Sequence, residues 1–177
     1  MPSKKIHFLL AGCILAAFLG GCAQGPSVRP SAPSSGVDSY SRSAAYHYSL
    51  SVLARQAGDL AEAIEQLKGA LAIQPDSAYL NTELVSLYVE NNNIDLALSL
   101  GEKVLASHPD CLDLRSIMGG LYYNLKEYDK AIREYETIIR MDPENQVAAL
   151  YLATIYAQEK KYDQAEKAYR KMLEIDP

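Results

Sequence analysis

The residue types that most often carry catalysis or hold metals are sparse in this chain. It has three histidines and three cysteines among 177 residues. His47 and His108 lie in different segments, and neither has a His, Cys or carboxylate neighbour at metal-ligand spacing. No phosphate-binding glycine loop or nucleophile elbow is present, and the pair Gly119-Gly120 fits close helix packing better. We therefore predict no catalytic residue, no metal site and no cofactor, and hence no enzyme activity in these residues.

The cysteines divide between the first residues of the chain and one later position. Cys13 and Cys22 lie close to the N-terminus, and Cys111 is alone in the rest of the sequence. No Cys-x-x-Cys pair occurs, so neither a disulfide framework nor a zinc site is available. The stability of the folded part must therefore come from apolar packing. We expect Cys111 to be a small packing residue at the start of a helix.

The N-terminus has the pattern of a secretory leader. Lys4 and Lys5 provide a positive start, and residues 6–21 are apolar apart from His7. Such a run is too short to span a bilayer comfortably. The sequence therefore favours a removed signal peptide over an uncleaved membrane anchor.

The leader ends in Leu19-Gly20-Gly21-Cys22, which resembles the lipobox of bacterial lipoproteins. The resemblance implies that residues 1–21 are removed and that Cys22 carries the acyl chains, palmitate among them. Several acyl chains hold a protein on a membrane durably, whereas a single one does so only marginally. A second match ends at Cys13, but it leaves an apolar run too short for a signal. Ala23 follows Cys22, and in lipoproteins similar to this one a residue other than aspartate there implies the periplasmic side of the outer membrane.

Residues 22–42 form the acylated cysteine and a linker rich in proline, serine and glycine. The whole chain carries a formal net charge of −5, and removal of the leader takes away Lys4 and Lys5 without any acid. An acidic mature chain is a poor ligand for nucleic acid or for anionic lipid. We therefore expect contact with the membrane through Cys22 alone.

Three residue types recur with one period in the rest of the chain. Proline recurs every 34 residues, and an alanine ladder and a tyrosine ladder keep the same step (Pro75, Pro109, Pro143, Pro177; Ala63, Ala97, Ala131, Ala165; Tyr88, Tyr122, Tyr156). Apolar residues between the prolines follow helical spacing. Asp59 is expected to cap a helix, and Gly58 to end one in the left-handed conformation. The predicted helices are 44–56, 60–73, 78–90, 94–107, 111–125, 128–141, 145–158 and 162–175.

The period and the ladder residues resemble the tetratricopeptide repeat family, whose unit is a 34-residue helix-turn-helix. The resemblance covers residues 44–177. It implies an all-α fold, a right-handed α-solenoid of four units with eight antiparallel helices, within a repeat domain of residues 43–177. The units are 44–77, 78–111, 112–145 and 146–177, and we expect the array to continue beyond Pro177, because no polar capping helix closes it.

Departures from the family pattern identify places of altered packing. The fourth place of the unit, often tryptophan in the family, holds smaller or polar residues (His47, Asn81, Arg115, Ala149). The second unit has the large Val85 at a place that usually holds a small residue, and Gly101 inside a helix, where glycine costs about 1 kcal/mol relative to alanine. This unit is predicted to be the least stable, unless a bulkier neighbour fills the space at Gly101.

In proteins similar to this one, five places on the first helix of each unit line a concave peptide-binding groove. The residues at these places include small ones, which would form the floor, and tyrosines beside them. The candidate groove residues are Tyr48, Val52, Tyr79, Thr82, Ser86, Asp113, Ser116, Gly120, Tyr123, Asn124, Leu150 and Thr154, and the same five places also hold Arg55, Gln56, Glu90, Val147 and Gln158. The lysine and asparagine set that clamps a terminal carboxylate in chaperone-binding members is missing. We therefore expect an extended peptide or a partner helix as the ligand.

These features predict a lipid-anchored scaffold or adaptor that assembles a cell-envelope complex through protein–protein interaction. The resemblance includes pilotin-like factors, and pilus or secretion-system biogenesis is our first choice. One alternative is that these repeats recognise substrate for a larger enzyme, such as a glycosyltransferase bearing similar repeats. Another is self-association through the uncapped last unit.

Overall fold

The computed structural model describes residues 43–175, and all the regular secondary structure in this range is α-helical. The helices are α2 (Ala44–Gln56), α3 (Leu60–Ile73), α4 (Ala78–Glu90), α5 (Ile94–Ser107), α6 (Leu112–Asn124), α7 (Tyr128–Met141), α8 (Gln146–Gln158) and α9 (Tyr162–Ile175). The predicted all-α fold class is confirmed. The predicted leader and linker, and Cys22, lie outside the described residues.

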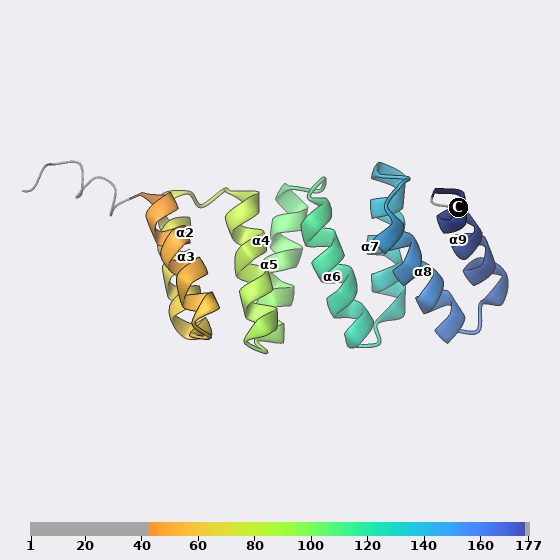
Figure 1. Ribbon diagram of the computed structural model, residues 1–177, viewed down its shortest axis with the longest axis horizontal. Helices are drawn as coiled ribbons and strands as arrows, with labels where there is room; N and C mark the ends of the chain where they lie inside the picture. The colour runs from red at the N-terminus through yellow and green to blue at the C-terminus, as the bar shows by residue number, and fades with distance from the viewer. Residues whose placement is uncertain (1–42, 176–177) are drawn as a thin grey trace, which may run out of the picture. The chain divides into compact units, whose positions relative to one another are not determined.

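The helices form hairpins, and each hairpin packs on the next along the chain. The pairs α2–α3, α4–α5, α6–α7 and α8–α9 are the hairpins, and contacts of α3 with α4, of α5 with α6 and of α7 with α8 join them. Figure 1 shows the pairs in chain order, with α2, α4 and α6 on the viewer's side. Further contacts run between α4 and α6, the first helices of two consecutive hairpins. This arrangement is a solenoid, in which each unit buries its apolar face against its neighbours.

One left-handed residue ends the first helix of every hairpin. Gly58, Asn92, Lys126 and Lys160 recur at the 34-residue period and have φ angles of 81°, 57°, 62° and 59°. The following residue donates its N–H back to the end of the helix in each hairpin, at 2.8–2.9 Å. These bonds satisfy carbonyls that the end of a helix leaves open. The prediction for Gly58 is thus confirmed, but in three hairpins a residue with a side chain takes the same backbone conformation.

Side chains cap the starts of several helices. Ser43, Asp59, Ser77 and Asn145 each accept a bond from the backbone N–H three residues later. The predicted helix bounds were wrong by one residue at three ends. Cys111 and Asn145 are N-caps and Leu125 is a C-cap, so these residues flank α6 and α8 instead of lying inside them.

Small residues allow the helices of each hairpin to approach closely. Ala63, Ala97 and Ala131 are fully buried, and Ala165 is 5% exposed. Ser51, which faces α3, is buried and donates its hydroxyl to the carbonyl of Ala63 at 2.8 Å. A hydroxyl inside the core is tolerated because it is hydrogen-bonded. The alanine ladder therefore marks the seam along which the two helices of a hairpin meet.

The glycine in α5 is matched by a large side chain from the next hairpin. A Cβ on Gly101 would lie 2.2 Å from Sδ of Met118, a residue of α6 that is fully buried. Met118 therefore fills the space that a side chain at position 101 would need. Val85 is also fully buried. The sequence alone did not decide whether a bulkier neighbour fills the space at Gly101. Met118 is that neighbour, so Gly101 does not leave a void.

The fourth place of the repeat is filled differently in each hairpin. The His47 ring lies over Gly69 and bonds Gln66 at 2.8 Å, and Arg115 bonds Glu134 at 2.5 Å. Asn81 donates to the carbonyls of Pro75 and Ser77. Polar contacts therefore replace the aromatic packing of the family in three hairpins.

None of the helices in residues 43–175 is both long enough and apolar enough to cross a membrane.

The packing at Gly101 predicts that Gly101→Ala changes the free energy of unfolding in opposite directions in two backgrounds. In the natural chain, Gly101→Ala should lower the free energy of unfolding by about 1 kcal/mol, because the clash with Met118 outweighs the gain in helix propensity. In a Met118→Ala background the same substitution should raise it by about 1 kcal/mol, since only the propensity gain remains. Urea unfolding of the four proteins measures both effects. A stabilising Gly101→Ala in the natural chain would show that Met118 does not fill the space.

The left-handed turn residues predict a stabilising substitution. Lys126→Gly should raise the free energy of unfolding by about 1 kcal/mol, because a side chain disfavours positive φ. Asn92→Gly is the matched control and should gain less, since asparagine tolerates this conformation better than lysine. Urea unfolding of both variants provides the comparison. Equal effects at the two positions would contradict the assignment of strain to Lys126.

Candidate interaction face

The predicted groove residues lie on the first helices of the hairpins, α2, α4, α6 and α8. With the exception of Thr82, all twelve are at least partly exposed. We call these eleven residues the first-helix face: Tyr48, Val52, Tyr79, Ser86, Asp113, Ser116, Gly120, Tyr123, Asn124, Leu150 and Thr154. Thr82 is 7% exposed, and its hydroxyl donates to the carbonyl of Ala78 at 2.8 Å. It packs between helices and is not accessible to a ligand.

Tyrosines from α2 and α4 join the first two hairpins on this face. The hydroxyls of Tyr48 and Tyr79 share a hydrogen bond of 2.5 Å, and the rings meet edge to face with centroids 5.6 Å apart. This hydrogen bond is the main cause that raises the pKa of Tyr79 to about 12. The Tyr79 phenol therefore stays neutral at physiological pH. Tyr79 remains 56% exposed and offers an aromatic surface with a polar tip.

A charged cluster lies beside the tyrosine pair. Arg55 of α2 reaches α4, where its guanidinium pairs with Glu83 at 3.3 Å and with Glu90 through two nitrogens. The hydrogen bonds to Glu90 are the main cause that raises the pKa of Arg55. The guanidinium is already shared between the two carboxylates of Glu83 and Glu90, and Asp113 in the first turn of α6 is also exposed on the first-helix face. The charge of this region is therefore acidic.

Aromatic residues also connect the third and fourth hairpins. Tyr123 of α6 accepts a hydrogen bond of 2.7 Å from Gln158 of α8. Its ring meets the ring of Tyr151 edge to face with centroids 6.2 Å apart. Leu150 and Tyr151 of α8 are 47% and 39% exposed. The sequence pattern missed Tyr151, because its place in the repeat is not among the groove places of the family.

The tyrosine ladder has a packing role, as expected. Tyr88, Tyr122 and Tyr156 are at most 9% exposed. Tyr122 donates to Glu102 at 2.8 Å, and Tyr156 donates to Glu136 at 2.9 Å. Each bond joins one hairpin to the one before it, and the two bonds are 34 residues apart. These tyrosines therefore do not contribute to an interaction face.

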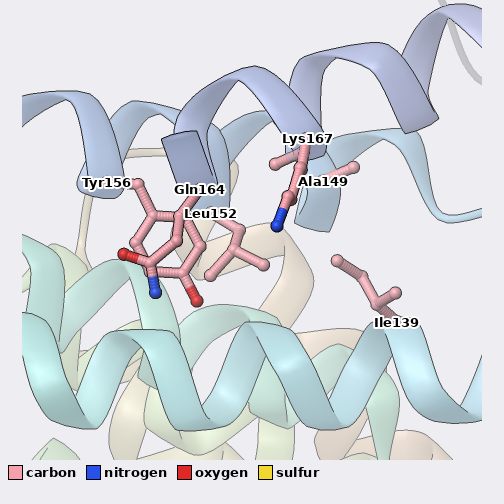
Figure 2. A pocket seen from close by; sticks show the side chains of 7 residues that line it. Ile139, Ala149, Leu152, Tyr156, Gln164 and Lys167 are labelled. Carbon is pink, nitrogen blue, oxygen red and sulfur yellow. The ribbon is translucent and has the colours of Figure 1, made fainter. Parts of the chain in front are cut away.

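An apolar hollow of about 280 Å³ lies between α7, α8 and α9. Figure 2 shows its lining side chains converging from the three helices: Ile139, Ala149, Leu152, Tyr156, Gln164, Lys167 and Ala168. Ala149 occupies the fourth place of the repeat, where the other hairpins have His47, Asn81 and Arg115. The absent side chain leaves the space open. The hollow was not predicted as a site, although the small residue at this place was a visible signal.

No group of three His, Cys, Asp or Glu side chains in residues 43–175 is placed to hold a metal ion. Cys111 is a free cysteine, half-buried, with Sγ 3.6 Å from the Thr82 hydroxyl. It lies at the start of α6 as a packing residue.

Comparison with solved structures agrees with the solenoid geometry. One crystal structure of MamA is 23% identical and superposes with a TM-score of 0.71, covering 80% of this chain and 82% of that one. A MamA structure from Desulfovibrio magneticus RS-1 is 18% identical, with a TM-score of 0.66 and 75% of each chain covered. At these identities the likeness shows the fold alone.

A tetratricopeptide repeat protein from Parabacteroides merdae is 27% identical, with a TM-score of 0.71 over 75% of this chain. This chain spans only 53% of the length of that protein. No curated protein matches the sequence.

Family models give the same result from the sequence. Two models, both described as tetratricopeptide repeat, match residues 54–118 and 118–177. Together they cover more than half of the chain and meet at Met118, the residue that fills the space beside Gly101. The chain therefore belongs to the tetratricopeptide repeat family.

Proposed function

We propose that this protein is a membrane-anchored scaffold whose first-helix face binds an extended peptide segment of a partner in a cell-envelope complex. Tetratricopeptide repeat arrays generally bind protein partners. The proposal concerns which surface is used, what it binds and where the protein acts.

The observation that carries the proposal is the pattern of sizes on the first-helix face. Narrow side chains, Ser86, Gly120 and Thr154, occupy the same place in three consecutive hairpins. Exposed aromatic and aliphatic side chains flank them, among them Tyr79 and Leu150. A narrow row beside tyrosines accommodates a backbone and provides apolar contact for its side chains. The tyrosines lose little conformational entropy on binding.

The charges on this face define the chemistry of the peptide. Arg55 is neutralised by Glu83 and Glu90, and Asp113 is exposed. A peptide with a terminal carboxylate or an acidic cluster would meet like charge without a free guanidinium to pair with. The face therefore favours an uncharged or basic segment with aromatic or aliphatic side chains.

We infer the location from the sequence. The lipobox-like segment ending at Cys22, the residue Ala23 and the linker up to residue 42 support a lipid anchor on the periplasmic side of the outer membrane. A linker of this length lets the repeat domain reach partners away from the bilayer surface. Pilus or secretion-system biogenesis is the envelope process that we propose first.

Gly120 provides the most direct test of the binding face. A Cβ at this position would lie 3.7 Å from the Tyr135 hydroxyl, an ordinary contact, so Gly120→Leu should fold. The leucine should fill the narrow row and weaken a bound peptide at least about tenfold, the loss expected when a contact of about 1.4 kcal/mol is removed. Isothermal titration with a peptide selected from a random twelve-residue phage library on the full chain measures the effect.

A matched control separates this effect from added hydrophobicity. Ala61→Leu places the same side chain at an exposed position of α3, a second helix of a hairpin. It should leave the affinity unchanged. If every selected peptide bound Gly120→Leu as tightly as the natural chain, the first-helix face would not be the binding surface.

Metabolic labelling tests the anchor. Cells that express the protein and grow with labelled palmitate should incorporate the label, and Cys22→Ala should abolish incorporation because the acylated thiol is lost. Cys13→Ala is the matched control and should retain the label. Label that persists in Cys22→Ala, or its absence from the natural protein, would contradict anchoring through Cys22.

A further inference from the structure

The most deeply buried tyrosine of the third hairpin lies under the first-helix face. Tyr135 of α7 is fully buried. Its ring packs on Gly119 of α6, where a Cβ would come within 2.9 Å of the ring. The ring of Tyr151 from α8 stacks on the Tyr135 ring with centroids 5.1 Å apart and planes inclined by 2°. The ring is thus held between the first helices of two consecutive hairpins.

The hydroxyl of Tyr135 is the one buried side-chain polar atom in the described part of the chain that lacks a hydrogen-bond partner. Tyr122 and Tyr156, which are also buried, donate their hydroxyls to Glu102 and Glu136. Leaving a buried hydroxyl unpaired is unfavourable, and phenylalanine would supply the same ring without that penalty. We therefore expect this hydroxyl to form a hydrogen bond with a group that the unbound chain does not supply.

The position of the hydroxyl relates it to the binding face. The nearest heavy atom to a Cβ built on Gly120 is the Tyr135 hydroxyl, at 3.7 Å. Gly120 is half-exposed and lies in the narrow row of the first-helix face. The ring thus extends from α7 past Gly119 to the underside of this row. Glycine at position 120 adds no side chain to the groups that cover the hydroxyl.

The hydroxyl keeps its proton at physiological pH. Burial is the main cause that raises the pKa of Tyr135, and the nearby Tyr151 and Tyr123 act in the same direction. A neutral phenol donates one hydrogen bond and accepts others. The commonest strong acceptor that an extended polypeptide presents at regular intervals is its own carbonyl oxygen.

We propose that the Tyr135 hydroxyl binds a backbone carbonyl of the peptide that crosses Gly120. The proposal rests on the proposed function of the first-helix face and identifies the group that fixes the peptide there. Since the hydroxyl is buried in the unbound chain, binding requires a side chain above it to move, and we infer that this is Tyr151, which stacks on the Tyr135 ring and is 39% exposed. A backbone contact of this kind fixes the register of the peptide without selecting a side chain at that point.

Tyr135→Phe tests the role of the hydroxyl, because it removes one oxygen and keeps the ring. The affinity of the selected phage peptides for the full chain should fall about tenfold, the usual effect of losing one hydrogen bond in a buried site. The thermal midpoint of the unbound variant should stay equal or rise. Tyr122→Phe is the matched control: it should lower the midpoint, since its hydroxyl bonds Glu102, and leave the affinity unchanged.

The outcomes distinguish the inference from the function on which it rests. If Gly120→Leu and Tyr135→Phe both lower the affinity of the selected peptides, the binding face and the role of the hydroxyl are both supported. If Gly120→Leu lowers the affinity but Tyr135→Phe does not, the proposed role of the hydroxyl is overturned and the binding face is still supported. If neither substitution lowers the affinity, the first-helix face is not the binding surface. A lower thermal midpoint for unbound Tyr135→Phe would show that the hydroxyl already has a structural partner.

Discussion

Close approach of successive hairpins is the constraint on which this structure depends. A two-helix hairpin has too little apolar surface to fold alone, so each one must bury its face against the hairpin before and the hairpin after. Close approach requires matched volumes at the seams. The alanine ladder provides small residues within the hairpins, while the pairs Gly101–Met118 and Gly119–Tyr135 exchange large for small across the helix contacts. The first pair joins the second hairpin to the third, and the second pair lies within the third hairpin.

Different residues serve the packing of the hairpins and the surface that we propose for binding. The second helices and the tyrosine ladder use their side chains for packing and for bonds such as that between Tyr156 and Glu136. The first helices carry one exposed stripe, where the chain has narrow residues and partly exposed tyrosines. Tyr135 belongs to both systems, since its ring packs the seam while its hydroxyl ends beneath Gly120. A packing residue therefore brings a polar group to the surface that we propose for binding.

Most of the fold could be predicted from the sequence because the repeat is local and periodic. The helix bounds were correct except at both ends of α6 and the start of α8, where capping residues had been counted as helical. The sequence alone did not decide what fills the space at Gly101, because Met118 reaches it from another hairpin. The pairing of Arg55 with Glu83 and Glu90, and the unpaired hydroxyl of Tyr135, depend on distances between hairpins in the same way. Periodicity gives the register of such contacts but not their partners.

The central claim is that a partner peptide lies along the first helices and not on the second helices or in the hollow beside Ala149. Amide chemical-shift mapping of the labelled full chain, titrated with a selected peptide, tests it most directly. The account predicts the largest shifts on the exposed stripe of α4, α6 and α8, centred on Gly120. Shifts concentrated on α5, α7 and α9, or around Ala149 and Lys167, would contradict it.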